Sequence, residues 1–403
     1  MKCFLLITLL VSFQANAQWQ VIDDTDSIPT TAAHVHGDYL FVTLSSTSLS
    51  GPIPDAFRRY SLTNPYQVQT IFDSLGVPYG PGEVESLGDY DGNLLALHRN
   101  LTTWFNYVMT SSDNGITWDE YYSFSSNSSP VRLRGSGNNL YIGADRTIYH
   151  SQDLSQPIDF VYYESQFVNT SMKPLLIHNG DGYFSQAAGL MRNGNVISSL
   201  EFRRMTKIGN DFYGFAEFDN FFKSTDLGVT WTLEAWHPFN YANIYELENF
   251  NGTLYACTEE GVYVSIDNGV NWVATNNGLP QYSGLTAPVY DITYYNGELF
   301  VATALGVFTL SESDVLSSLG TNQNEHVRPL VKVHPNPTNE KTFVHGSEFH
   351  DLSIVDQLGR DIPYTFIKNN EGIEIAIRDF DGVCFIRYTD ENELLRTLRL
   401  LVQ

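Results

Sequence analysis

One octapeptide in the first third of the chain combines residue types that could do chemistry. SSDNGITW, residues 111–118, places Ser111, Asp113, Gly115 and Trp118 at fixed offsets. Such a set could belong to a catalytic motif, or to a metal loop in which carboxylates surround a glycine. The same side-chain oxygens could instead cap backbone amides in a tight turn. The way in which the pattern repeats decides between these alternatives.

The pattern occurs three times as Ser-x-Asp-x-Gly-x-(Thr/Asn)-Trp. Asp226 and Asp267 are 41 residues apart, and a decayed copy with Ser151 and Asp153 follows Asp113 by 40 residues. A fixed period near 40 residues indicates a repeat architecture rather than a single site. The residues of the second and third copies are Ser224, Asp226, Gly228 and Trp231, and Ser265, Asp267, Gly269 and Trp272.

The rest of each repeat has the character of a β-hairpin. A Gly/Asn/Asp turn precedes an aromatic-rich strand seven times between about residue 30 and residue 311, as in NGTLYACT at 251 and NGELFVAT at 296. Four short strands in each of seven units predict an all-β, seven-bladed β-propeller over residues 18–312. The last unit lacks a fourth strand, and we expect residues 19–22 to supply it and to protect the open edge.

The repeated motif is similar to the Asp-box, or BNR repeat, of sialidase-like and other propellers. In that family the box is the turn between the third and fourth strands of a blade, on the face opposite the ligand. Ser and Asp cap the turn, Gly accepts a positive φ, and Trp packs between blades. We therefore interpret the three boxes as scaffold.

Both ends of the chain carry export signals. Lys2, the apolar run to Phe13 and the Ala15-Asn16-Ala17 box predict a signal peptide over residues 1–17. Residues 313–330 are polar and aperiodic, which predicts a linker, and residues 331–403 contain about seven short strands of a small β-sandwich. The segments PNP at 335–337, Ile354 to Arg360 and Gly382 to Phe385 resemble the C-terminal sorting domain of type IX secretion.

That resemblance implies export through the type IX machinery, with residues 331–403 as its partner. It also implies a protein that is secreted or held at the outer-membrane surface of a Gram-negative bacterium. Cys384 stands where the family usually has tyrosine.

The composition restricts the remaining choices. The chain of 403 residues has 46 Asp and Glu against 22 Lys and Arg, a net charge of −24, which argues against nucleic-acid binding. No later stretch approaches the about 20 apolar residues of a transmembrane helix. Cys/His spacings for zinc are missing, so we expect no metal and no cofactor. We expect Cys257 and Cys384 to be buried free thiols.

Residues for catalysis are harder to find. Sialidase-like enzymes use three arginines and a tyrosine nucleophile, and their early Phe/Tyr-Arg-Ile-Pro motif is missing here. Arginines 132, 134, 203 and 204 could form a basic pocket, but we interpret them as exposed strand-end residues. Two carboxylates facing a cleft would suffice for glycoside hydrolysis. Candidates for such a pair are Asp23, Asp24, Asp26, Glu83 and Glu85, and Asp89 and Asp91 are a minor candidate for Ca²⁺.

Aromatic residues in the loops that enter the blades suggest binding instead. AWHPFNYAN is the richest of these loops, and exposed aromatics next to Asn and Ser suit sugar rings or protein hot spots. We therefore expect a non-catalytic module for a glycan or a surface protein. A divergent glycoside hydrolase and an assembly or adhesion factor are the alternatives. The expected ligand-binding residues are Trp236, His237, Phe239, Tyr241 and Tyr282, with Tyr79 and Phe167 in weaker loops.

Overall fold

The computed structural model describes most of the chain after the N-terminal segment. The described residues are 18–22, 29–44, 57–63, 68–72, 82–100, 105–125, 130–136, 138–144, 147–163, 173–186, 188–216, 219–235, 238–239, 242–282, 284–321, 333–334, 341–345, 350–356, 360, 362–369, 372–377, 380, 382–389 and 395–402. Nearly all of their regular structure is antiparallel strand, as the alternating aromatic runs predict. The chain divides into two compact units, residues 1–321 and 322–403.

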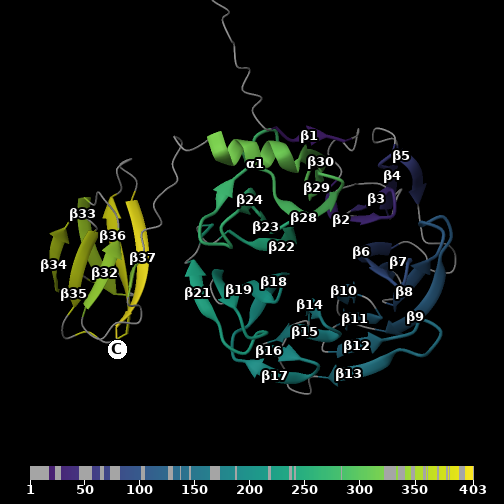
Figure 1. Ribbon diagram of the computed structural model, residues 1–403, viewed down its shortest axis with the longest axis horizontal. Coiled ribbons are helices and arrows are strands. Elements are labelled where there is room, and N and C mark those ends of the chain that lie inside the picture. Colours follow the sequence, from purple (N-terminus) through teal and green to yellow (C-terminus); the bar gives the residue numbers. More distant parts are fainter. Residues whose placement is uncertain are drawn as a thin grey trace, which may run out of the picture. The chain divides into compact units, whose positions relative to one another are not determined.

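Seven four-stranded antiparallel sheets build the described part of the first unit. Their first strands contact one another in cyclic order, and Figure 1 shows the sheets following each other around a ring. The first four sheets are β2 (Thr30–His36), β3 (Tyr39–Leu44), β4 (Phe57–Ser61), β5 (Val68–Phe72); β6 (Gly82–Tyr90), β7 (Asn93–Asn100), β8 (Phe105–Ser111), β9 (Asp119–Ser125); β10 (Pro130–Ser136), β11 (Asn139–Ala144), β12 (Thr147–Ser151), β13 (Asp159–Tyr163); and β14 (Lys173–His178), β15 (Asp181–Gln186), β16 (Gly189–Arg192), β17 (Asn195–Ser198). The other three are β18 (Phe202–Ile208), β19 (Asp211–Ala216), β20 (Asn220–Ser224), β21 (Thr232–Ala235); β22 (Ile244–Phe250), β23 (Thr253–Thr258), β24 (Gly261–Ser265), β25 (Val273–Ala274); and β28 (Val289–Tyr295), β29 (Glu298–Thr303), β30 (Gly306–Ser311), β1 (Gln20–Val21).

The second strand of each sheet is deeply buried. β23 is buried at all six positions, and β3, β15 and β29 are buried at every position after the first. A strand whose two faces are both covered by neighbouring sheets must be apolar on both, which explains continuous runs such as LYAC. The hydrophobic core is therefore a series of clusters between successive sheets, such as the one that joins Phe41 to Leu94 and Met109.

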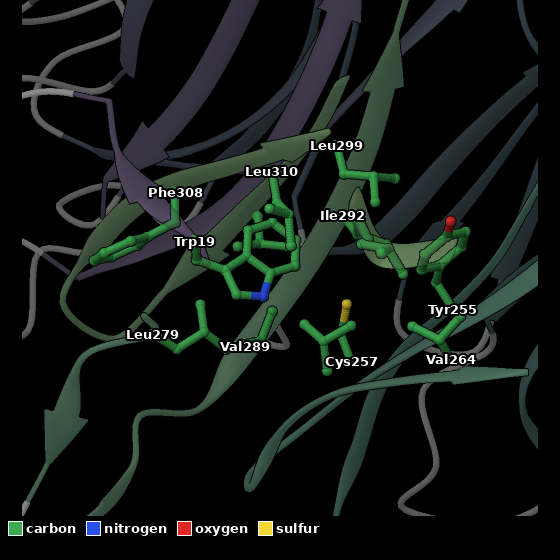
Figure 2. Close-up of a cluster of buried hydrophobic side chains, with 13 residues drawn as sticks. Trp19, Tyr255, Cys257, Val264, Leu279, Val289, Ile292, Leu299, Phe308 and Leu310 are labelled. Atoms are coloured by element: carbon green, nitrogen blue, oxygen red, sulfur yellow. The ribbon is translucent and has the colours of Figure 1, made fainter. Parts of the chain in front are cut away.

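The N-terminal strand completes the last sheet. In β1, Gln20 pairs with Thr309 and Val21 with Phe308 of β30, so β1 takes the position that the sequence assigns to residues 19–22. Trp19 is only 2% exposed and donates from Nε1 to the Thr275 carbonyl at 2.6 Å. Figure 2 shows its ring within the cluster that also contains Leu279, Val289 and Leu310.

One segment differs from the prediction. Residues 312–321 form helix α1 (Glu312–Thr321) and not the start of a polar linker. Ser311 caps the helix by accepting the Asp314 amide at 3.1 Å, and Val315 is completely buried against the last sheets. The apolar stripe of the helix is short, since it consists of Val315 and of Leu319 one turn later. Two apolar residues among polar ones are too few to indicate a helical period in the sequence.

The second unit contains seven described strands in two sheets. The first sheet has the order β31 (Val333–His334), β32 (Lys341–His345), β35 (Gly372–Ile377), β34 (Tyr364–Asn369); the second has the order β33 (His350–Asp356), β36 (Gly382–Thr389), β37 (Leu395–Val402). Both sheets contribute to one core, in which Val344 and Ile375 from the first pack with Ile354 and Ile386 from the second. At the end of β33, Asp356 Oδ2 accepts a hydrogen bond from Arg360 Nε at 2.6 Å. Residues 335–337 lie outside the described residues.

Cys257 and Cys384 are buried free thiols, as expected. Within the described residues, no helix has the length and apolarity required to span a membrane.

Candidate functional site: a charged cluster inside the ring

The three boxes are turns held by their own side chains. Ser111 Oγ donates to Asp113 Oδ1 at 2.8 Å and accepts the Gly115 amide at 2.8 Å. Asp113 also accepts the amide and the hydroxyl of Thr117, and these bonds lower its pKa to about 2. Trp118 Nε1 donates to the Gly115 carbonyl at 3.2 Å. Both carboxylate oxygens are thus engaged in the turn.

The second and third copies repeat this geometry. Asp226 and Asp267 accept the same amides four residues on, each at 2.8 Å, and Trp231 and Trp272 donate to the glycine carbonyls. The turns join β8 to β9, β20 to β21 and β24 to β25, that is, the third strand to the fourth. The decayed copy at Asp153 joins β12 to β13 and keeps a bond from the Ser155 amide to its carboxylate.

The expected aromatic loop is only partly within the described residues. Phe239 is 2% exposed and packs against Phe215, Tyr263 and Trp272, with centroids 5.4, 4.5 and 5.3 Å away. It is therefore a core residue and not a free contact for a ligand, because the rings that surround it belong to the hydrophobic cluster between two neighbouring sheets. Trp236, His237 and Tyr241 lie outside the described residues, as do Tyr79 and Phe167. Tyr282 is in the two-residue strand β26 (Gln281–Tyr282), which pairs with β27 (Leu285–Thr286).

The expected carboxylates do not form an open pair. Glu85 lies 3.6 Å from Arg99, and Asp23, Asp24 and Asp26 are outside the described residues. Glu83 belongs to β6. Asp89 Oδ1 lies 3.1 Å from His34 Nε2 and 2.6 Å from His36 Nδ1, so this carboxylate links the first two sheets. No group of three or more His, Cys, Asp or Glu within the described residues is arranged to hold a metal ion.

A bulge in each inner strand creates a site that sequence reasoning missed. The pairing of the first strand with the second shifts by one residue in all seven sheets, for example between Ile244 and Glu246 and between Val289 and Asp291. A bulge re-aims the side chains that follow it. The residue after the bulge is charged in four sheets: Arg132, Arg204, Glu246 and Asp291.

These residues, together with Arg134 and Glu248, form what we call the axial cluster. Arg132 contacts Glu246 through its guanidinium, and Arg134 lies 3.4 Å from Glu246 and 3.1 Å from Glu248. Arg204 Nε is 3.9 Å from Glu246. Arg132 and Arg134 belong to β10, and Glu246 and Glu248 belong to β22. Since β14 and β18 lie between these two strands in the ring, the arginine–glutamate contacts run across the interior of the ring. The arginines 132, 134 and 204, which were predicted to be exposed, are thus partly buried and face Glu246, whereas Arg203 is exposed and pairs with Asp219.

Enclosure and charge give the three carboxyl groups different proton affinities. Burial alone would raise the pKa of Glu246, but Arg132, Arg134 and Arg204 outweigh it and hold the pKa at about 2. Burial raises the pKa of Glu248, whose ion pair within the described part of the chain is with Arg134. Burial, reinforced by Glu246, raises the pKa of Asp291 to about 7. The cluster therefore holds one firmly ionised carboxylate and one carboxyl that titrates near neutral pH.

An aromatic pair adjoins the cluster. Tyr245 and Tyr290 occupy the bulge positions of β22 and β28, with ring centroids 4.9 Å apart and planes at 67°. Both side chains are partly exposed. The Tyr245 carbonyl accepts a bond from Arg204 Nε, which ties the pair to the charges. Aromatic faces beside fixed polar groups are the usual lining of sites for sugars and peptides.

A signal for this site was present in the sequence. The alternating acids of IYELEN at 244–249 and the arginines of VRLRG at 131–135 both lie in inner strands. Aligning the inner strands of all repeats would have placed them at one level of the ring. The bulges turn these side chains toward one another. The alternation of polar and apolar residues along a strand does not reveal where a bulge lies.

Solved structures with this architecture have little sequence in common with the chain. YCF48 bound to D1 peptide has a TM-score of 0.50 at 12% identity, over 73% of this chain and 96% of that one. The β-propeller domain of Cps50 (Swd1) from Myceliophteria thermophila has a TM-score of 0.50 at 10% identity, over 73% and 99%. The extracellular domain of BT4673 from B. thetaiotaomicron has a TM-score of 0.51 at 14% identity, over 94% of this chain and 54% of that one.

These likenesses define the fold of the first unit as a β-propeller and confirm the all-β prediction. No protein-family model matches the sequence, and neither does any curated protein.

Proposed function

We propose that the chain is a seven-bladed Asp-box propeller that binds a glycan or a protein without catalysing a reaction. The Tyr245–Tyr290 pair beside the axial cluster carries this proposal. The two rings come from neighbouring sheets and are partly exposed, so they offer an amphipathic surface next to fixed charges. Each residue is the second of its strand, Tyr245 in β22 and Tyr290 in β28.

The arrangement of the charges favours binding over catalysis. Each arginine of the cluster contacts Glu246, so these guanidinium groups are committed to the protein itself. A sialidase-like reaction needs arginines that are free to hold a substrate carboxylate. Compensated charges instead give a rigid polar surface that orients a ligand.

Ligand screening with matched variants tests this proposal. The chain from residue 18 to 403 is applied to a glycan array and to immobilised surface proteins of the source cell. Tyr245→Ala and Tyr290→Ala should each weaken binding at least tenfold, because stacking on both rings is lost. Tyr294→Ala is the control, since Tyr294 lies at the other end of β28, where it stacks on Phe250. Equal binding by all variants would contradict this site, and a protein ligand would favour an assembly or adhesion role.

A hydrolase is the second candidate, because the pKa values of two enclosed carboxyl groups diverge. Glu246 is ionised and Asp291 titrates near neutral pH, which is the pattern of a base or nucleophile with an acid. Against this, both Asp291 oxygens already accept backbone amides, from Ala33 at 3.0 Å and Ile292 at 2.9 Å. Turnover of glycoside substrates that disappears in both Asp291→Asn and Glu246→Gln would replace the binding proposal.

We further propose that the second unit is a sandwich that directs type IX export. The two sheets with a shared core and the hydrogen bond between Asp356 and Arg360 suit the resemblance noted in the sequence. In this proposal residues 1–17 are removed at the inner membrane, and residues 331–403 engage the secretion machinery. A chain ending at Thr321 should then remain in the periplasm of a host with type IX secretion, whereas the full chain reaches the surface or medium. Equal export of both chains would contradict a sorting role.

A further inference from the structure

The C-terminal part of the ring is made without basic residues. Residues 224–321 contain eleven aspartates and glutamates but neither lysine nor arginine. They form the whole sixth sheet, β22 to β25, and three strands of the seventh, β28 to β30. The chain as a whole has 22 Lys and Arg, so their absence is a local property of these two sheets. A ligand that meets this part of the ring therefore meets a negative potential.

Five of these acids are committed to the fold. Glu246 and Glu248 lie beside arginines of the axial cluster. Asp226 and Asp267 accept the amides of their own box turns. Asp291 accepts two backbone amides. These carboxylates are therefore not the ones that a ligand would meet first.

Glu259 and Glu260 are differently placed, in the turn between β23 and β24. Glu259 Oε2 accepts Asn243 Nδ2 at 2.6 Å, and Glu260 Oε2 accepts the Tyr263 hydroxyl at 3.2 Å. Both partners are neutral, and neither carboxylate takes part in an ion pair of the described residues. Burial, the neighbouring tyrosine and the charge of Glu259 all raise the pKa of Tyr245, which places this carboxylate near the aromatic pair. The charge of both side chains is thus available to a ligand.

The topology brings these carboxylates to the same end of the sheets as the aromatic pair. Successive strands of an antiparallel sheet run in opposite directions, so the turn between the second and third strands lies where the first strand begins. Glu259 and Glu260 therefore share an end with Tyr245 and Tyr290, and the box turns lie at the other end. The connection from the sixth to the seventh sheet also reaches this end and carries the hairpin of β26 and β27, in which Leu285 is 73% exposed. We call this surface, with its five named residues, the aromatic end.

We propose that the aromatic end binds a protein segment in which basic and apolar side chains alternate. This inference rests on the proposed function, since it uses the same aromatic pair, and it adds the chemistry of the ligand. Lysine or arginine side chains of the segment lie over the tyrosine rings, whose faces attract cations. The same side chains approach Glu259 and Glu260, and the apolar side chains pack on Leu285. The rings and Leu285 define the surface, and the charge selects what it binds.

The charges at this end disfavour the other ligands of an aromatic surface. The arginines of the axial cluster face Glu246, and Arg203 Nη1 lies 3.1 Å from Asp219 Oδ1. An acidic glycan therefore finds these cations already paired and is repelled by the remaining carboxylates. A neutral glycan can stack on the rings but gains no attraction from the net charge. A basic segment uses both features, which is why we choose it as the occupant.

Peptides that differ only in charge test this chemistry. A labelled peptide that repeats Lys-Ser-Leu is compared by fluorescence anisotropy with the same peptide carrying Gln or Glu in place of Lys. The chain from residue 18 to 403 is used at about 0.15 M salt, where screening limits attraction by distant charges to about 8 Å. We expect the lysine peptide to bind at least about tenfold more tightly than the glutamine peptide, and the glutamate peptide not to bind. Equal binding of the lysine and glutamine peptides, or no binding of the lysine peptide, would overturn the proposal.

Matched charge variants locate the binding. Glu259→Gln combined with Glu260→Gln removes two charges and keeps the oxygens that accept hydrogen bonds, so the ring should stay folded. This double variant should weaken binding of the lysine peptide at least about fivefold. The control is Asp119→Asn combined with Glu120→Gln, because these exposed acids follow a box turn at the other end of the second sheet. Equal weakening by both double variants would mean that the peptide responds to the net charge of the chain, which would overturn the proposal.

Tyr245→Ala separates this inference from the proposed function. If Tyr245→Ala weakens the lysine peptide and the Glu259 and Glu260 double variant does not, the aromatic site stands and the choice of a basic ligand is wrong. A glycan whose binding depends on Tyr245, with no peptide bound, would likewise overturn the choice of a protein segment. If Tyr245→Ala changes the binding of no probe, the site of the proposed function fails as well. Unfolding midpoints of all variants verify that the ring is intact.

Discussion

Glycine at the fifth position of each box meets two separate demands. Gly115, Gly228 and Gly269 all have positive φ, at 77°, 86° and 86°. A Cβ atom on Gly269 would also lie 1.8 Å from Phe221 Cε1, whereas one on Gly252, with φ of 88°, would meet nothing within 4 Å. Gly269 and Gly252 therefore both need a residue that accepts positive φ, but only Gly269 also needs a residue without a side chain.

The pair Gly269→Ala and Gly252→Ala separates these two demands. Gly252→Ala should cost about 1–2 kcal/mol of unfolding free energy, the price of a left-handed alanine. Gly269→Ala should cost about 1–3 kcal/mol more, because Phe221 and the Trp272 packed on it must move. Urea unfolding of both variants provides the comparison. Equal losses would mean that the close contact is relieved without strain.

His98 is the residue whose burial should govern acid stability. It is completely buried in β7, and neither of its ring nitrogens has a hydrogen-bond partner among the residues that the structure describes. Burial lowers the pKa of His98 to about 4, against about 6.5 in an unfolded chain. The unfolded state therefore takes up the proton first, and stability falls as pH drops from about 6.5 to about 4, by about 3 kcal/mol in total.

The variant His98→Leu should remove this part of the pH dependence. Leu44 holds the corresponding sixth position of β3, so leucine suits such a site. Unfolding free energies at pH 7 and pH 4.5 should differ less in the variant than in the wild type, with the variant more stable at the lower pH. Parallel curves for the two proteins would show that folding does not lower the pKa of His98.

At the scale of elements, the ring depends on strand β1. β1 has only two paired residues, but Trp19 beside it fills the cluster between the last two sheets, as Figure 2 shows. Trp19→Ala should lower the unfolding free energy by about 3–5 kcal/mol, since a large buried ring and its bond to Thr275 are lost. Val21→Ala on the same strand should cost less than about 0.5 kcal/mol, because Val21 is 53% exposed. Similar losses would place the stabilisation in the strand pairing rather than in the tryptophan.

Elements whose residues interact within a few positions of the sequence could be predicted. Features that depend on how distant strands are aligned could not. The box turns repeat because Ser, Asp and Gly satisfy one another within five residues, so the sequence reveals them directly. Helix α1 was missed because its apolar contacts with the ring, the buried Val315 and the partly buried Leu319, are only one turn apart. The axial cluster was missed because Arg132 and Glu246, 114 residues apart, meet only after each strand is shifted by a bulge.

At the scale of the whole molecule, the two units have separate cores. The core of the second unit contains only residues between Val344 and Val402, and the clusters of the ring end at Leu319. The last sheet is completed by β1, which pairs with β30, and α1 packs against that part of the ring; both elements lie before residue 322. Its stability should therefore not depend on the second unit.

Calorimetry of the chain from residue 18 to 403 and of a chain ending at Thr321 tests this independence. We expect two unfolding transitions in the longer chain, one of which persists in the shorter chain with its midpoint unchanged within about 2 °C, since a loss of 1 kcal/mol would move it by about 2–4 °C. Val315→Ala in the shorter chain should lower that midpoint, because Val315 is buried against the ring, and Leu316→Ala should not, because Leu316 is 40% exposed. A lower midpoint on truncation alone would mean that the second unit stabilises the ring.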